Sequence, residues 1–201
     1  MQGLNAQLAN RQVQLLHYVC DSFYTGKILM KSGDITEQLV NYNLLTGEMI
    51  YQNNGKFLAI ANPKDVDTVF IQNRKFVPVN DVFYEWLTGS EPALFEEFTG
   101  TIKEPGAETG FGTTNASAAS SLNSLVKSGG VYELKLPDQF KVIPSHNYWM
   151  RNAGKFYLVN NARQLVKLFP SKKQWIEDWI KANNTNFSKQ KDVIALIKSL
   201  H

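Results

Sequence analysis

Ser124 and Lys127 have the spacing of a nucleophile and its base. In the S-x-x-K pattern of acyl-transfer enzymes, the lysine one helical turn after the serine accepts the hydroxyl proton. The overlapping Lys127-Ser128-Gly129 imitates the second signature of that chemistry, yet the reaction needs its second lysine from a separate strand. A hydrolase that uses Ser124 and Lys127 is therefore kept as an alternative, and chance in a serine-rich loop is the simpler explanation.

Other chemically reactive residues lack the spacing that a site would need. The single cysteine, Cys20, excludes a zinc site built on several thiolates, and no spacing supplies an orienting carboxylate for a pair with His17. The Gly-Phe-Gly segment at 110–112 lacks the further glycine and the lysine of a phosphate-binding loop. Adjacent Glu96 and Glu97 would point to opposite faces of a strand. We expect no metal site and no cofactor.

Aromatic residues are the best candidates for a binding surface, since they make up 12% of the chain. Neighbouring rings such as Tyr148 and Trp149 point to opposite faces of a strand, so one can be exposed while the other fills the core. Residues 105–130 are rich in glycine and poor in core residues, which predicts a long mobile surface loop. We expect Phe111, Tyr148 and Trp149 to edge a binding surface with this loop as its movable wall. Core filling is the alternative role of these rings.

The composition favours a folded globular chain. Hydrophobic residues make up 43% and charged residues 19% of the 201 residues. An average soluble protein has about 25% charged residues, so this balance argues against disorder. No apolar run approaches the ~18 residues that a membrane-spanning helix needs, and no transmembrane segment is expected.

Charge is divided unevenly along the chain. Residues 1–150 carry 11 Lys and Arg against 15 Asp and Glu, whereas residues 151–201 carry 10 against 3. The basic segment could bind phosphates or anionic lipid, or it could face the acidic part of the same fold. Nucleic-acid binding through this segment is a further alternative. It is disfavoured because the segment lacks the interleaved aromatic and basic residues of single-strand platforms.

Short apolar runs between turn residues predict an antiparallel meander. Hairpin turns are expected at residues 32–34, 53–55 and 152–154, where glycine can take a positive φ. Pro78 should lie on an edge strand or at a strand end. The expected strands are 25–30, 36–43, 48–52, 56–60, 68–71, 75–79, 83–87, 131–136, 140–143, 148–150 and 156–159.

The C-terminal end is predicted to form two helices. The first, capped by Ser171, buries a stripe that includes Trp175 and Trp179, and it ends at Asn183-Asn184. Ser188 is expected to cap the second. The buried face of that second helix is expected to be Val193, Ile194, Ile197 and Leu200.

The expected fold class is α+β: a mostly antiparallel β-sheet that could curl into a partial barrel, with two C-terminal α-helices. Residues 1–201 are expected to form a single domain. Within it, residues 1–22 form a segment that could be helix or strand, residues 23–160 a β-rich body, and residues 161–201 a helical end.

The chain contains one candidate internal repeat. Residues 55–70 align without gaps on residues 154–169 with five identities. This pattern indicates either a duplicated hairpin or two hairpins that obey the same turn physics.

Five stretches of sequence carry a family resemblance. They are residues 23–28, the Gly33-Asp34 turn, and residues 41–49, 66–69 and 167–170. These stretches resemble uncharacterised, signal-bearing envelope proteins of the Bacteroidetes. The resemblance spans most of the chain, includes no catalytic motif, and implies an exported, β-rich protein that is periplasmic or associated with the outer membrane. In that case an export signal has been removed before Gln2; a cytoplasmic protein is the alternative.

These features favour a non-catalytic cell-envelope protein that binds a protein partner, a carbohydrate or a lipid. Around the acidic residues 81–108 a neutral or cationic ligand is favoured over a phosphate-rich one. The identity of the ligand and the oligomeric state stay open.

Overall fold

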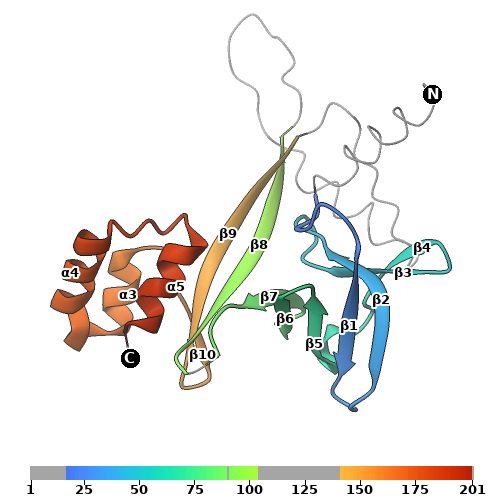
Figure 1. Cartoon of the computed structure of the whole chain (residues 1–201), viewed down its shortest axis with the longest axis horizontal. Coiled ribbons are helices and arrows are strands. Elements are labelled where there is room, and N and C mark those ends of the chain that lie inside the picture. The colour runs from blue at the N-terminus through green and yellow to red at the C-terminus, as the bar shows by residue number, and fades with distance from the viewer. Residues whose placement is uncertain (1–16, 90, 104–140, 201) are drawn as a thin grey trace, which may run out of the picture. The chain divides into compact units, whose positions relative to one another are not determined.

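The computed structural model describes residues 17–89, 91–103 and 141–200, which fall into two compact units (Figure 1). Among these residues, unit 1 contains 17–83, 98–103 and 141–145, and unit 2 contains 84–89, 91–97 and 146–200. The expected loop at 105–130 and the expected strand at 131–136 lie outside the described residues, as do residues 1–16. A single cooperative domain stays a prediction.

The fold class is α+β with an antiparallel sheet, as the sequence predicts. The strands pair in the order β10-β9-β8-β7-β6-β5-β1-β2-β3-β4, so the ten-stranded sheet has two ends and does not close into a barrel. The strands are β1 (Tyr24–Met30), β2 (Ile35–Tyr42), β3 (Met49–Asn53), β4 (Lys56–Ala59), β5 (Val66–Ile71), β6 (Arg74–Val79), β7 (Val82–Trp86), β8 (Ala93–Lys103), β9 (Lys141–Asn152) and β10 (Lys155–Leu158).

The three predicted hairpin turns are confirmed by backbone geometry. Gly33 between β1 and β2 has a φ of 94°. The β3–β4 turn has φ values of 48° at Asn54 and 78° at Gly55, and the β9–β10 turn has 48° at Ala153 and 74° at Gly154. Two successive positive φ angles match the right-handed twist of the flanking strands, which fixes the register of both hairpins.

Strand β8 is the one strand in the described part of the chain that was not predicted from the sequence. Its adjacent Glu96 and Glu97 interrupt the alternation of polar and apolar residues by which a strand is recognised. Strand β9 is longer than expected, because it runs without a break through Pro144. Pro78 is the penultimate residue of β6 and lies at a strand end, as predicted.

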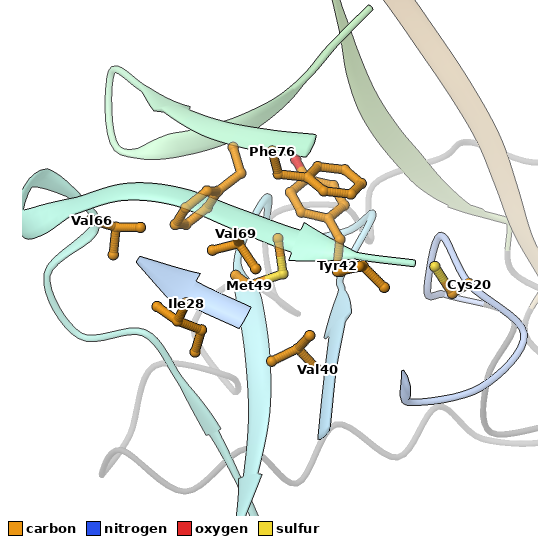
Figure 2. Packing of buried hydrophobic residues seen from close by; sticks show 10 residues of the cluster. Cys20, Ile28, Val40, Tyr42, Met49, Val66, Val69 and Phe76 are labelled. Atoms are coloured by element: carbon orange, nitrogen blue, oxygen red, sulfur yellow. The ribbon is translucent and has the colours of Figure 1, made fainter. Parts of the chain in front are cut away.

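The core of unit 1 lies on one face of its strands (Figure 2). Its central members, Val40, Met49, Val69 and Phe76, have no exposed surface. Tyr42 stacks on Phe76 with the ring centroids 5.9 Å apart. Among the described residues, the buried members of this cluster are Cys20, Ile28, Val40, Tyr42, Met49, Val66, Val69, Ile71, Phe76 and Phe83.

A buried amide attaches the segment before β1 to β2. The Asn41 side chain is fully buried, and its Oδ1 accepts from the Cys20 backbone N–H at 3.0 Å. Its Nδ2 donates to the Cys20 and Ser22 carbonyl oxygens at 2.8 and 2.9 Å. These bonds satisfy an amide that would be costly to bury alone, and they hold Cys20 against the core.

The described C-terminal part contains three α-helices, where the sequence predicted two: α3 (Ala162–Leu168), α4 (Lys173–Asn183) and α5 (Gln190–Lys198). The additional helix, α3, begins at the Asn161 cap, whose side chain accepts from the Gln164 backbone N–H at 3.0 Å. Gln164 in turn accepts from the Asn160 backbone N–H at 2.8 Å. This reciprocal capping stabilises a helix too short to be recognised by periodicity.

The two predicted serine caps are wrong. Ser171 lies inside a short 3-10 turn (η2, Pro170–Lys172), and α4 begins after it without a side-chain cap. At the start of α5, Asn186 accepts from the Ser188 backbone N–H, and Asp192 accepts from that of Asn186. The predicted end of α4 is confirmed, since Asn184 takes the left-handed conformation there with a φ of 48°.

The core of unit 2 joins the three helices to strands β8 and β9, beside which the helices are drawn in Figure 1. The prediction that Trp175 is buried is wrong, because 37% of it is exposed, and Ile176 is the fully buried residue of α4. Trp175 stacks on the half-buried Trp179 at 5.3 Å. The buried residues of the cluster are Leu94, Tyr148, Met150, Val159, Leu165, Ile176, Val193, Leu196, Ile197 and Leu200.

The sequence similarity between residues 55–70 and 154–169 corresponds to two similar hairpins, and the structural similarity ends after these hairpins. Ile60 N donates to Met49 O at 3.0 Å in the first copy, and Val159 N donates to Tyr148 O at 2.9 Å at the aligned positions of the second. After Asn62 the chain forms a 3-10 turn (η1, Pro63–Asp65) and then β5, whereas the second copy continues into α3. The β-branched residues of β5 favour a strand, so the same first turn leads to two different elements.

Gly26 provides a test of the packing in unit 1. A Cβ built at Gly26 would lie 2.3 Å from Val40 Cγ2 and 2.5 Å from the Phe70 backbone oxygen. Gly26→Ala should destabilise unit 1 by about 1–3 kcal/mol, because β1 must move against its neighbours. Urea unfolding measures this, and Gly89→Ala is the matched control, since its Cβ would meet nothing within 4 Å. Equal stability of the two variants would contradict the tight approach of β1.

The packing of α4 can be tested with two substitutions on neighbouring residues. Ile176→Ala should cost about 2–5 kcal/mol of unfolding free energy, because it leaves a cavity under the helix. Trp175→Ala should cost about 1 kcal/mol or less, because it removes only a stacking contact at the surface. Thermal unfolding of both variants measures the difference, and a larger loss for Trp175→Ala would contradict the orientation of α4.

Candidate functional site

The candidate site lies on the face of unit 2 that points away from the helices. Register pairs Tyr84 with Glu97 and Trp86 with Phe95 across β7 and β8, and residues paired in this way share one face. Leu94 points to the opposite face and packs under the helices. We call the first face the aromatic face, and it consists of Tyr84, Trp86, Phe95, Glu97, Asn147, Trp149, Arg151 and Phe156.

The rings of the aromatic face support one another. Tyr84 and Trp149 stack with centroids 6.1 Å apart and planes inclined by 18°, and Phe156 meets Tyr84 edge-on at 6.1 Å. Trp86 lies 5.6 Å from Phe95. Tyr84 and Phe95 are buried, whereas the two tryptophans and Phe156 are half-buried. The inner rings therefore hold the outer ones in fixed orientations, since such offset and edge contacts are the favoured aromatic geometries.

Polar side chains fix Trp149. Glu97 Oε2 accepts from Trp149 Nε1 at 2.8 Å and from Asn147 Nδ2 at 3.1 Å. Asn147 Oδ1 accepts from Asn160 Nδ2 at 2.8 Å. Because its N–H is already used, the Trp149 indole can offer a ligand its π-face.

Arg151 lies over the other tryptophan. Its guanidinium carbon is 5.4 Å from the centre of the Trp86 ring and 5.3 Å from that of Phe95. Arg151 Nε donates to Glu91 Oε1 at 2.7 Å, and the two side chains are 32% and 48% exposed. Trp86 Nε1 donates to the Thr88 carbonyl oxygen. Within the described part of the chain, the Arg151 Nη groups stay available as donors beside the rings.

Burial raises the pKa of Tyr84 to about 12, and the neighbouring Glu97 carboxylate adds to this increase. The Tyr84 hydroxyl is therefore protonated at neutral pH and can donate to Glu97. The aromatic face thus combines rigid rings with carboxylate, amide and guanidinium groups, which suits recognition by stacking and hydrogen bonding.

Glu96 lies on the helix side of β8 and is 3% exposed. Its carboxylate contacts side chains from α5 and β9. Glu96 Oε2 accepts from Gln190 Nε2 of α5 at 2.5 Å, and Glu96 Oε1 lies 3.4 Å from His146 Nδ1. Glu85 is its register partner on β7. Burial, with Glu96 and Glu85 nearby, raises the pKa of Tyr148 above its usual range. These contacts connect α5 to the sheet.

The sequence-predicted site residues separate in the structure. Trp149 belongs to the aromatic face, whereas Tyr148 has no exposed surface and belongs to the core under the helices. This separation is the one that strand alternation predicts for neighbouring rings. Phe111 lies outside the described residues, as do Ser124 and Lys127 of the hydrolase alternative.

The other members of the aromatic face were not predicted from the sequence. Alternation along β9 would have placed Asn147 and Arg151 with Trp149, since residues two apart share a face. Glu97 and Phe95 could not be added in the same way, because β8 was not recognised as a strand. Trp86 was part of an aromatic cluster in sequence, but only strand pairing brings it beside Phe95.

Cys20 and His17 are both buried in unit 1. Cys20 is buried in the core of unit 1, and its Sγ lies 3.9 Å from Arg74 Nη1. His17 is 2% exposed, and its ring lies 4.3 Å from that of Tyr18. Burial lowers the pKa of His17 from 6.5 to about 4, so the imidazole is neutral in the folded chain at neutral pH.

No protein-family model, curated protein or solved structure matches this chain. Within residues 17–89, 91–103 and 141–200, no three His, Cys, Asp or Glu side chains gather in a way that could hold a metal ion. In the same part of the chain, no helix has the length and apolar character needed to cross a membrane. The aromatic face is therefore the feature of the described residues that bears on function.

The neutral, buried His17 makes unit 1 sensitive to acid. Below pH 6.5 the unfolded chain gains a proton at His17, whereas the folded chain does not until the pH approaches about 4. Unfolding free energy should therefore be lost as the pH falls from 6.5 to 4, by about 3 kcal/mol from this residue. Urea unfolding of the wild type and of His17→Gln at pH 7 and 4.5 measures this. An equal loss in both proteins would contradict the assignment to His17.

Proposed function

We propose that this chain is a non-catalytic binding protein that holds a carbohydrate on the aromatic face of unit 2. The observation that carries the proposal is the pair of half-buried tryptophans, Trp86 and Trp149, each held in place by a neighbouring ring and by a hydrogen bond from its own Nε1. Rigid indole faces offer flat apolar contact at little entropic cost.

The polar groups beside the rings match the chemistry of sugar hydroxyls, which both donate and accept hydrogen bonds. Glu97 can accept, the Arg151 Nη groups can donate, and the Asn147 amide can do both. The apolar face of a sugar ring, with its outward C–H groups, would stack on an indole. Glu97, Arg151 and Asn147 would then hydrogen-bond to the hydroxyls of the sugar. A few placed polar groups on an apolar surface are the usual composition of a small-molecule site.

Charge narrows the class of ligand. Two carboxylates, Glu91 and Glu97, lie on or beside the aromatic face against the single guanidinium of Arg151. Glu91 already pairs with Arg151 at 2.7 Å, so an anionic ligand would have to compete for that cation and would also meet Glu97. These charges support a neutral or amino sugar over an acidic or phosphorylated one.

The sequence also left open a lipid ligand, a protein partner and a location in the cell envelope. A lipid chain would prefer an enclosed apolar cavity to a face edged by charged groups. If the face binds a protein partner instead, none of the oligosaccharides in the titration should bind. The cell-envelope location comes from the resemblance of five sequence stretches to envelope proteins, and it suits a protein that meets surface or nutrient glycans.

The proposal can be tested by titrating the protein with a panel of neutral and amino-sugar oligosaccharides in a calorimeter. Trp86→Ala and Trp149→Ala should each weaken binding about tenfold or more, since losing a stacking platform removes roughly 1–3 kcal/mol. Trp175→Ala is the matched control, because that exposed tryptophan lies on α4 and outside the aromatic face.

Circular dichroism and thermal unfolding show whether each variant keeps its fold. Arg151→Gln should weaken binding while leaving the rings in place, which separates hydrogen bonding from stacking. Binding that survives in both Trp86→Ala and Trp149→Ala would contradict this site. Failure of every sugar in the panel to bind would contradict the carbohydrate proposal as a whole.

A further inference from the structure

A chain of hydrogen bonds leads from the backbone of β9 to the Trp149 indole. The Tyr148 backbone N–H donates to Asn160 Oδ1 at 2.7 Å, and Asn160 Nδ2 donates to Asn147 Oδ1 at 2.8 Å. Asn147 Nδ2 donates to Glu97 Oε2 at 3.1 Å, and the same oxygen accepts from Trp149 Nε1 at 2.8 Å. We call the side chains of Asn160, Asn147 and Glu97 the polar chain.

The direction of each bond in the polar chain is set by its first donor. A backbone N–H can only donate, so Asn160 turns its Oδ1 toward Tyr148 and its Nδ2 toward Asn147. Asn147 must then present its oxygen to Asn160 and its nitrogen to Glu97. An inverted Asn147 amide would place two nitrogens together at one end and two oxygens together at the other. Both bonds would be lost.

Stacking alone does not fix the Trp149 indole. The ring stacks on Tyr84 at 6.1 Å, but an indole turned over about its χ2 torsion could stack equally well, because that torsion has two broad minima. The bond from Trp149 Nε1 to Glu97 selects one of the two orientations. The Glu97 carboxylate can itself rotate, and the bond from Asn147 restricts it. Trp149 therefore keeps one orientation as long as Asn160 orients Asn147.

The similar β3–β4 hairpin forms without an asparagine at the position of Asn160. The strand register is the same in both hairpins, with Ile50 in the place of Trp149. Ile50 is fully buried, and the residue in the place of Asn160 is Ala61. A hairpin of this geometry thus closes without the asparagine. Asn160 occurs in the hairpin that carries the tryptophan.

We propose that Asn160 is a positioning residue of the aromatic face, which acts through Asn147 and Glu97 to hold the Trp149 indole in the orientation on which a sugar stacks. This inference rests on the carbohydrate proposal for the use that the indole serves, whereas the orientation of the ring can be measured without any sugar. The Asn160 backbone N–H also donates to Gln164 Oε1 at 2.8 Å, so the polar chain connects the start of α3 to the aromatic face.

The orientation of Trp149 can be followed by the proton–nitrogen NMR signal of its indole, assigned with Trp149→Phe. Asn160→Asp keeps an oxygen for the Tyr148 N–H but removes the Nδ2 donor, so Asn147 should turn over and lose its bond to Glu97. This variant should shift the Trp149 signal and make its N–H exchange with water about tenfold faster or more. Asn160→Ala, which removes the whole amide, and Asn147→Leu, which interrupts the polar chain at its next residue, should do the same.

Asn161→Ala is the matched control. The Asn161 side chain caps α3 by accepting from the Gln164 backbone N–H at 3.0 Å, and it is not a member of the polar chain. This variant should lower the melting temperature, as the loss of a helix cap does, and leave the Trp149 signal unchanged. An unchanged Trp149 signal in the folded Asn160 and Asn147 variants overturns the proposal. So does an equal shift in Asn161→Ala, since the start of α3 as a whole would then set the ring.

Calorimetry with cellotriose and with the trisaccharide of glucosamine, as members of the sugar panel, separates this proposal from the carbohydrate one. Asn161→Ala should bind as the wild type does, and Asn160→Asp should bind at least about threefold more weakly. Unchanged affinity in Asn160→Asp overturns the positioning role and leaves the carbohydrate proposal standing. If no sugar of the panel binds the wild type while the Asn160 variants shift the Trp149 signal, the carbohydrate proposal fails and the orientation of Trp149 by Asn160 stands.

Discussion

Successive side chains of a β-strand point to opposite faces, and unit 2 depends on this constraint at Glu96 and Glu97. Glu96 points under the helices, where Gln190 of α5 donates to its carboxylate and His146 lies nearby. Glu97 points the other way and holds Trp149 and Asn147 in the aromatic face. A buried carboxylate is costly unless it is hydrogen-bonded, so the contacts of Glu96 let β8 carry two adjacent acids and serve both faces.

In unit 1 the buried polar side chains that connect separate segments are amides instead of carboxylates. Asn41 is fully buried in β2 and uses both ends of its side chain to hold the backbone around Cys20 and Ser22. Asn43, also fully buried, accepts from the Leu45 backbone N–H at 2.8 Å in the turn that follows β2. Because their hydrogen bonds are made within the fold, both amides can be buried without leaving polar groups unpaired.

Features that depend on interactions between near neighbours in the sequence could be predicted, whereas features that depend on distant contacts could not. Hairpins at Gly33, Asn54-Gly55 and Ala153-Gly154 were predicted because a turn is decided by the φ angles that a few neighbouring residues can adopt. Strand β8 was missed because Glu96 has its partners on α5 and β9, far away in sequence. Helix α3 was missed because its stability comes from capping and from burial of Leu165 in the unit 2 core rather than from a long periodic stripe. Of the aromatic face, only the opposite directions of Tyr148 and Trp149 could be predicted from the sequence.

The sequence by itself determined the hairpins, the antiparallel α+β class and the opposite directions of neighbouring side chains, since all three follow from local stereochemistry and from the alternation of apolar residues. Tertiary structure decided which of two opposite faces is covered. Trp149 and Tyr148 differ by one position, yet one lies in the aromatic face and the other under the helices. Trp175 and Ile176 differ in the same way on α4. Burial is a property of the elements that pack together, and those elements are brought into contact only when distant parts of the chain fold onto one another.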